Sequence, residues 1–215
     1  MRSFLTVTTP ATDLTLLTIG EMREAAGVTG NSSDATLIRM AARNAASIMT
    51  HCDIAVGAGA PPTLRRETLT ETIYQACGEQ LMLSRRHEVA ITSLVEDGVT
   101  LLDADFEIDP ESALVTKLCS DLPTLWSARK VVVVYDAGFA VVPDDLRDAA
   151  MDFLRSSWLE RGRDPLLKSE RIRIPDVRDV ERDYWVGGVP GQSSEGAVPD
   201  PVAGKLTRFL NPRVA

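Results

Sequence analysis

The side chains of this sequence that most often carry catalysis or bind metals are two histidines and three cysteines. His51 and Cys52 are neighbours in a segment predicted to be helical. Consecutive residues of a helix point to different faces, so this pair cannot chelate one metal ion. The cysteines, Cys52, Cys77 and Cys119, are odd in number and far apart, which predicts free thiols in a reducing compartment rather than a disulfide framework. His87 lies between charged residues and is predicted to be on the surface.

The sequence also lacks the short motifs that mark common active sites, namely CxxC, HExxH, GxSxG and a Walker-type loop. Asp103, Asp105, Glu107 and Asp109 alternate, and a strand would place them on one face. Such oxygen ligands could hold calcium, but charged residues are also typical of an exposed strand edge, where they prevent unwanted pairing. We favour the edge, and we predict no catalytic residue, no metal site and no cofactor.

The charge of the chain is unevenly distributed. Its net charge is −8. Residues 1–162 hold 14 basic and 23 acidic side chains, which gives −9, whereas residues 163–215 hold 9 and 8, which gives +1. An acidic body argues against a nucleic-acid-binding surface, which would be basic. No run approaches the ~18 apolar residues of a membrane span, so no membrane association is predicted.

One strand and one helix must position whatever site the chain has. Four valines and Tyr135 predict a strand over residues 129–135, because β-branched and aromatic side chains suit a pleated sheet. Gly138 permits a turn. Pro143 suits the first turn of a helix, and Leu146 begins an apolar stripe over 144–161 at helical spacing. Trp126 is assigned to a loop before the strand.

The rest of the body is predicted to combine helices with a β region. A capping box at Thr18 and Glu21 begins a short helix over about 19–27. A long alanine-rich helix follows over 33–53, and its apolar stripe consists of Leu37, Ile38, Ala41, Ala45, Ile48, Met49 and Cys52. Residues 64–135 alternate as antiparallel strands with a hairpin at Asp97-Gly98. The fold class is therefore α+β, with residues 1–17 forming an arm or a short strand.

Residues 163–215 are predicted to form an extended C-terminal tail. A glycine-rich linker over 187–199 precedes a short helix over 200–210, whose apolar stripe consists of Val202, Leu206, Phe209 and Leu210. Such a short helix is marginal alone in water and needs a surface to lie on. It either folds back on its own domain or docks on a neighbouring protein.

The strand end at 132–138 and the helix start at 142–146 resemble the "V-x-Y-x-A-G" and "V-P-x-D-L" segments of the head–tail adaptor (connector) proteins of long-tailed phages and gene-transfer agents. The order of elements over 18–162 is also similar to theirs: a short helix, an alanine-rich helix, a β insertion with an Asp-Gly hairpin, and a closing helix. On this resemblance, Tyr135, Gly138, Pro143 and Leu146 are the fold signature.

The resemblance implies a structural virion protein at the head–tail interface, assembled in the host cytoplasm. Twelve copies would form a ring under the portal, extend the DNA channel without binding DNA specifically, and contact the next neck or stopper protein. The helix over 200–210 would then dock on the portal. The alternatives are another neck component, such as a stopper or tail-completion protein, and a small ligand-binding or enzymatic domain. The resemblance leaves open whether the particle is a phage or a gene-transfer agent.

Overall fold

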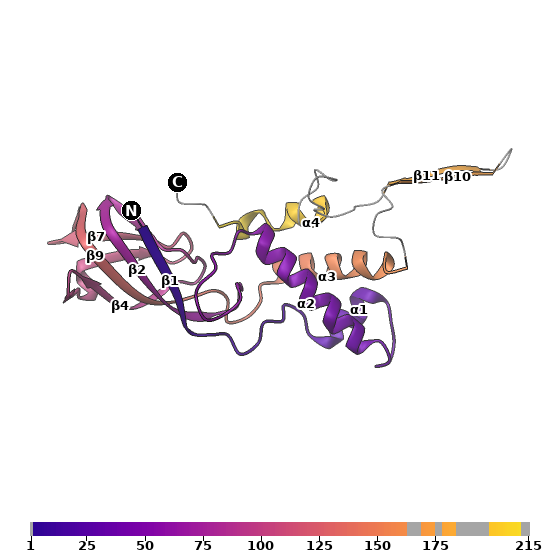
Figure 1. Cartoon of the computed structure of the whole chain (residues 1–215), viewed down its shortest axis with the longest axis horizontal. Coiled ribbons are helices and arrows are strands. Elements are labelled where there is room, and N and C mark those ends of the chain that lie inside the picture. Colours follow the sequence, from indigo (N-terminus) through magenta and orange to yellow (C-terminus); the bar gives the residue numbers. More distant parts are fainter. Residues whose placement is uncertain (1, 163–168, 175–177, 184–197, 212–215) are drawn as a thin grey trace. The chain divides into compact units, whose positions relative to one another are not determined.

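The computed structural model describes residues 2–162, 169–174, 178–183 and 198–211. It has the predicted α+β class and divides into two compact units. Unit 1 comprises Met1–Leu14, Asp53–Pro143 and Leu210–Ala215, and unit 2 comprises Thr15–Cys52 and Asp144–Phe209. Unit 1 holds the strands β1 to β9 and unit 2 holds the helices (Figure 1).

The larger sheet of unit 1 has five antiparallel strands in the order β1-β2-β9-β4-β5. The strands are β1 (Arg2–Thr9), β2 (Glu67–Gly78), β9 (Trp126–Ala137), β4 (Ala90–Glu96) and β5 (Val99–Thr100). The valine-rich β9 lies at the centre, where alternate side chains such as Val131, Val133 and Tyr135 are buried. This central place explains why the strand has so many β-branched residues.

A second, smaller sheet pairs β3 (Gln80–Met82), β7 (Leu114–Cys119) and β6 (Phe106–Asp109), and β8 (Leu122–Thr124) pairs with β7. A 3₁₀ turn, η1 (Asp103–Asp105), precedes β6. Leu81 and Val115 of this sheet share one hydrophobic core with Leu69 and Ile73 of β2. The core of unit 1 therefore comprises the inward side chains of both sheets.

The β region corrects two details of the prediction. Trp126, assigned to a loop, is the first residue of β9 and is buried, and its indole Nε1 donates to the carbonyl of Val115 at 3.1 Å. Strand β8 was not predicted, because its three residues carry no alternating pattern that sequence could detect. Of the two alternatives for residues 1–17, the strand is confirmed by β1.

Unit 2 is built around α3 (Asp144–Leu159), which α1 (Ile19–Ala26), α2 (Asp34–His51) and α4 (Asp200–Lys205) contact. The capping box of α1 is confirmed: the Thr18 side chain accepts from the Glu21 N–H, and Glu21 accepts from the Thr18 N–H. Gly27 ends this helix in the left-handed conformation. Each helix therefore begins close to where local sequence signals predicted, but the predicted helix over 200–210 is α-helical only over Asp200–Lys205 and is followed by the 3₁₀ turn η2 (Thr207–Phe209).

The buried face of α2 is rotated from the predicted stripe. Leu37, Ile48 and Met49 are buried as expected, but Ile38 is 48% exposed, and Ala41 and Ala45 are only half-buried. Met40 and Asn44 take their place in the interior. Asn44 was overlooked because it is polar; its amide Nδ2 donates to the Ser157 hydroxyl of α3 at 3.0 Å, which satisfies it inside the helix pair.

Residues 169–183 contain a hairpin that the sequence pattern did not predict, formed by β10 (Ser169–Ile174) and β11 (Arg178–Asp183). The predicted linker over 187–199 lies outside the described residues except for its last two, Val198 and Pro199. The division of the chain after residue 162 remains a prediction. Among the helices that the structure describes, none has the length and apolarity needed to cross a membrane.

Candidate interaction surfaces

The four signature residues hold the end of β9 and the start of α3. Tyr135 is buried, and its hydroxyl donates to Glu71 at 2.9 Å. Gly138 has φ +93, and a Cβ there would lie 2.6 Å from the carbonyl oxygen of Arg65, so only glycine fits. Pro143 directly precedes α3, and Leu146 is buried. These residues determine structure and expose no reactive group.

A buried polar cluster surrounds Tyr135 in unit 1. The Glu71 carboxylate accepts from Tyr135 and from both the N–H (2.9 Å) and the hydroxyl (2.6 Å) of Ser84. Beside it, the guanidinium of Arg85 lies 3.6 Å from the carboxylate of Glu67, and both side chains are buried. The cluster therefore ties the segment after β3 to β2 and β9.

Burial determines the protonation of this cluster. It raises the pKa of Glu67, against the opposing effects of the Ala11 N–H and Arg85, and it lowers the pKa of Arg85. Burial, followed by the nearby Glu71 charge, raises the pKa of Tyr135 well above 10. Because these groups are enclosed by protein, they do not present an acid–base pair to a substrate, and the charged forms of Glu67 and Arg85 are costly in this interior.

The sequence prediction missed these buried carboxylates, although the strand period contained the signal. Glu67 and Glu71 have the same parity along β2 as Leu69 and Ile73, which face the core. In a strand, residues of one parity share a face. Their partner Arg85 comes from outside the strand, so only the tertiary structure could identify it.

The residues first considered for metal chemistry do not gather into a site. Within the described part of the chain, no group of three or more His, Cys, Asp or Glu side chains could hold a metal ion. Asp103 and Asp105 belong to the 3₁₀ turn rather than to a strand, and Asp105 accepts from the Leu102 N–H at 2.8 Å. Asp109 accepts from the Glu111 N–H at 3.0 Å and from the Ser112 hydroxyl. These carboxylates therefore cap turns.

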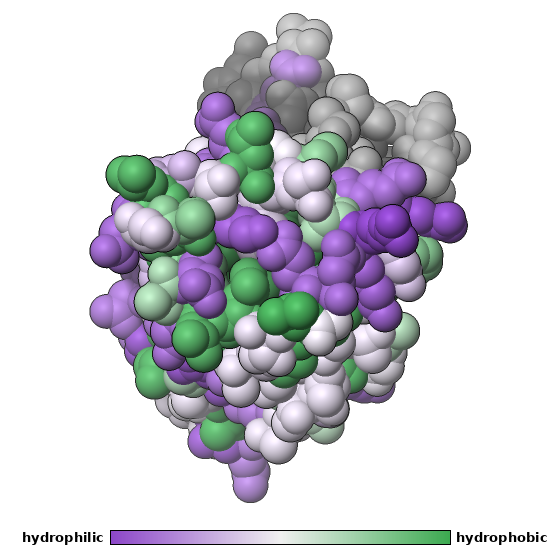
Figure 2. All heavy atoms as spheres, turned by 90° about the vertical axis from the view of Figure 1, so that its left-hand side faces the viewer, coloured by the Kyte–Doolittle hydropathy of each residue, from purple (hydrophilic) through white to green (hydrophobic). Residues whose placement is uncertain are grey.

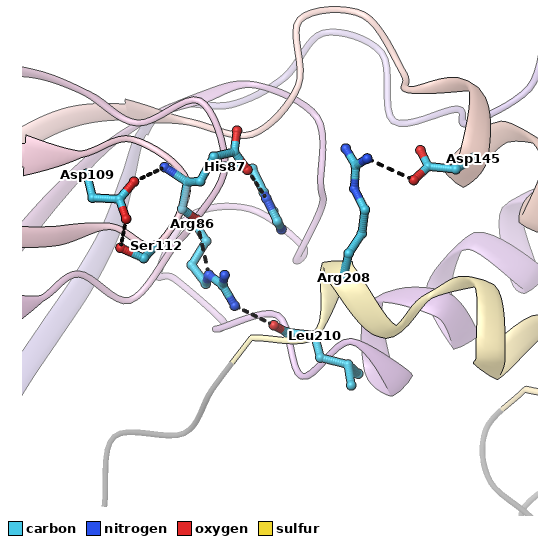
Figure 3. Close-up of polar contacts among 8 residues, drawn as sticks. Arg86, His87, Asp109, Ser112, Asp145, Arg208 and Leu210 are labelled. Carbon is cyan, nitrogen blue, oxygen red and sulfur yellow. Dashed lines mark hydrogen bonds and ion pairs between the residues drawn. The ribbon is translucent and has the colours of Figure 1, made fainter.

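His87 is also placed differently from its prediction. It is buried rather than on the surface, its ring stacks on Phe139 with centroids 5.0 Å apart, and its Nδ1 lies 3.1 Å from a carboxylate oxygen of Glu111 (Figure 3). Its backbone also receives a hydrogen bond from the Gly138 N–H at 2.9 Å. Charged sequence neighbours gave the wrong prediction because the turn at 87–88, with positive φ, directs the ring inward.

The C-terminal stripe is largely covered within unit 2. Val202, Leu206 and Phe209 are buried, and α4 packs on α3. Leu210, the fourth member of the stripe, is 38% exposed. Arg208 forms an ion pair with Asp145 at 3.0 Å (Figure 3), and Lys205 forms another with Asp152. This is the fold-back arrangement, and docking of the stripe on a portal remains a prediction.

Leu210 and Asn211, which come after Phe209, belong to unit 1. The guanidinium of Arg86 donates to the carbonyl of Leu210 at 2.7 Å (Figure 3). The side-chain amide of Asn211 donates to the carbonyls of Ser84 at 3.0 Å and Asp53 at 3.4 Å. Side-chain donors that bind main-chain carbonyls therefore hold this short stretch within unit 1.

An open groove of 640 Å³ lies on unit 1 where β1, β2 and β9 run side by side. Its lining combines two arginines, two aromatic rings and one amide: Arg2, Phe4, Tyr74, Gln75 and Arg129. Figure 2, which looks onto the left-hand side of Figure 1, shows hydrophobic side chains interspersed with hydrophilic ones. The sequence did not reveal the groove, because its residues come from three strands whose register only the fold sets.

Comparison with known proteins gives a match in structure alone. No protein-family model matches the sequence, and no curated protein does. The chain is similar to a chain in the neck of an empty GTA (gene-transfer agent) particle computed with C6 symmetry, with a TM-score of 0.54 and 18% identity over 99% of this chain and 97% of that one. It is also similar to a chain in the neck of a native GTA particle computed with C12 symmetry, with a TM-score of 0.50 and 17% identity over 99% and 97% of the two chains. Over nearly its full length, the protein therefore has the fold of a chain found in particle necks.

Proposed function

We propose that this protein is a head–tail adaptor, a structural virion protein whose copies form a ring beneath the portal and extend the DNA channel. The observation that carries the proposal is the fold shared over nearly the full length with chains from symmetric particle necks. A ring is the natural product of repeated head-to-tail contacts between identical copies. The C12 symmetry of one of those necks supports twelve copies here.

The chemistry of the chain is consistent with a passive channel. Its buried polar groups, Glu67, Glu71, Arg85 and Tyr135, serve the interior of unit 1. The net charge of −8 would repel the phosphate backbone rather than retain it. We propose that the ring lines its channel with net negative charge, so that DNA passes without being held.

The experiment is addition of the purified protein to DNA-filled heads made in cells that lack its gene. An adaptor should bind such heads directly, in about twelve copies per head, and should restore their joining to tails. A stopper or tail-completion protein would bind only after another neck protein was already in place. Heads that join tails normally without this protein would rule the proposal out.

We further propose that the C-terminal segment, residues 198–211, contributes to portal binding. Leu210 is exposed, but Val202, Leu206 and Phe209 pack within unit 2, so these three can reach a portal only if the segment leaves α3. The two ion pairs at its surface are worth little and would not prevent release.

Two measurements test this second proposal. A chain truncated after residue 197 loses the cover of α4 on α3 and should be less stable, and it should fail to attach to heads under conditions where circular dichroism shows that it is folded. Hydrogen exchange of the intact chain, free and bound to heads, should show protection of the α4 amides changing on binding. A truncated chain that attaches normally would leave the segment with a purely internal role.

A further inference from the structure

We propose that neighbouring copies in the ring contact each other through two different surfaces of unit 1, the groove over β1, β2 and β9 and the acidic tip that follows β5. The groove of one copy would take the tip, with Leu102 and Asp103, of the next copy. The inference rests on the proposed ring and names the surfaces that would form it.

The groove has the composition of a protein contact site. The Arg2 guanidinium lies 5.0 Å from the centre of the Phe4 ring, and Phe4 meets Tyr74 edge to face with centroids 6.0 Å apart. Arginine and tyrosine are enriched among the residues that contribute most to protein interfaces. Within the part of the chain that the structure describes, neither Arg2 nor Arg129 forms an ion pair, so both charges remain available to a partner.

The tip that follows β5 carries the complementary charge, and it lies within an acidic segment that also spans β4 and β6 to β8. Residues 88–128 contain nine acidic side chains and one lysine, Lys117, a net charge of −8. That lysine is already paired with Glu96 at 2.6 Å. Among these acidic residues, Asp103 is exposed and directly follows Leu102, which is 71% exposed, and Val99 nearby is 66% exposed. An apolar tip bordered by carboxylates fits a groove that combines aromatic rings with guanidinium groups.

The order of the strands places these two surfaces apart. β1 forms one edge of the sheet and β5 the other, with β2, β9 and β4 between them. The groove reaches from β1 to the central β9, and β4 and β5 lie beyond it, so the groove and the tip are different surfaces of one copy. Two different surfaces produce a head-to-tail contact, which repeats around a ring, whereas a self-complementary patch would stop at a dimer.

One acidic residue, Asp97, lies close to the groove. The Asp97 carboxylate accepts from the backbone N–H groups of Arg129 at 3.2 Å and Lys130 at 2.8 Å. These hydrogen bonds go to the main chain, and within the described residues Asp97 forms no ion pair with the Arg129 guanidinium. Nucleic acid is a weaker candidate for the groove, because the carboxylates of 88–128 belong to the same unit and would repel phosphate.

The test uses two charge reversals, Arg129→Glu and Asp103→Arg, in particles produced in cells that carry only the variant gene. Each variant alone places like charges across every contact, and we expect its copy number per particle to fall at least tenfold. Co-expressed, the two variants can alternate around the ring with opposite charges at every contact, and incorporation should return. The double variant in one chain should also be incorporated. Arg155→Glu, which reverses an exposed arginine of unit 2, is the matched control and should behave as the wild type.

Several outcomes would overturn the inference. Single variants that are incorporated normally, or a mixture that does not recover, would show that the groove and the tip do not meet. Equal loss with the Arg155→Glu control would show an unspecific effect of charge. Loss of single-stranded DNA binding by Arg129→Glu, with copy number unchanged, would make the groove a nucleic-acid site instead. Absence of the wild-type chain from purified particles would count against the proposed function, not only against this contact.

Discussion

Gly138 illustrates how much of this fold depends on single residues. It has φ +93, and the carbonyl oxygen of Arg65 occupies the space that a Cβ would need. Gly98 has nearly the same conformation, with φ +91, but no atom lies within 4 Å of its Cβ position. A side chain at Gly98 would therefore meet backbone strain alone, whereas a side chain at Gly138 would meet backbone strain and a steric clash.

We predict that Gly138→Ala destabilises the protein by at least about 2 kcal/mol more than Gly98→Ala. The left-handed conformation alone costs roughly 1–2 kcal/mol at either site, and the clash adds to this only at Gly138. Urea denaturation of both variants measures the difference. Equal losses would mean that the Arg65 carbonyl can move aside at little cost.

Tyr135 gives a prediction about pH. Burial, and then the charge of Glu71, raise its pKa well above 10 in the folded chain, whereas an unfolded tyrosine ionises near pH 10. Above pH 10 the unfolded chain loses this proton and the folded chain keeps it. The stabilisation is therefore complete below pH 10 and is lost as the pH rises.

We expect the free energy of unfolding to fall more steeply above pH 10 in the wild type than in Tyr135→Phe, by up to about 1.4 kcal/mol per pH unit. At neutral pH, the variant should lose about 1.5–3 kcal/mol, because a hydrogen bond to the buried Glu71 carboxylate is removed. Urea melts between pH 7 and about pH 11 provide both numbers. Parallel pH profiles for the two chains would show that Tyr135 does not contribute to alkaline unfolding.

At the scale of elements, the stability of unit 2 depends on how α1, α2 and α4 cover α3. Phe153 and Leu154 of α3 are buried, as their helical spacing predicted. The same pattern misplaced the face of α2, since Ile38 is exposed and Asn44 is internal. Alanine contributes little to a hydrophobic pattern, so in an alanine-rich helix the predicted buried face depends on a few large side chains. The exposed Ile38 therefore shifted the predicted buried face of α2 away from the observed one.

We predict that Phe153→Ala lowers the free energy of unfolding by about 3–5 kcal/mol, because the variant loses the apolar contacts of the buried ring and leaves a cavity in its place. Leu159 lies on the same helix but is 73% exposed, so Leu159→Ala should change stability by no more than about 0.5 kcal/mol. Denaturant melts of both variants give the comparison. A loss below about 1 kcal/mol at Phe153 would show that the helices can close around the gap.

At the scale of the whole molecule, charge governs what the protein can bind. The chain has a net charge of −8. We predict no sub-micromolar affinity for double-stranded DNA, since binding by counterion release needs a basic surface. A mobility-shift assay at low salt measures this, with a basic DNA-binding protein as the positive control. Salt-sensitive binding below about 1 µM would contradict both the prediction and the passive channel.

The amino-acid sequence by itself determined the features that depend on neighbouring residues. Helical spacing predicted α1, α2 and α3, the capping box at Thr18 set the start of α1, and the valine run predicted β9. The Asp97-Gly98 turn predicted the hairpin between β4 and β5. These signals are readable because caps, turns and side-chain periods act within a few residues of the chain.

Only the tertiary structure decided which distant residues meet. It paired Glu67 with Arg85 and Tyr135 with Glu71, buried His87, and covered three members of the C-terminal stripe. It also assembled the groove of Arg2, Tyr74 and Arg129 by aligning three strands. Such contacts join residues tens of positions apart, and they depend on strand register and helix orientation, which the packing of the whole unit sets rather than any local pattern.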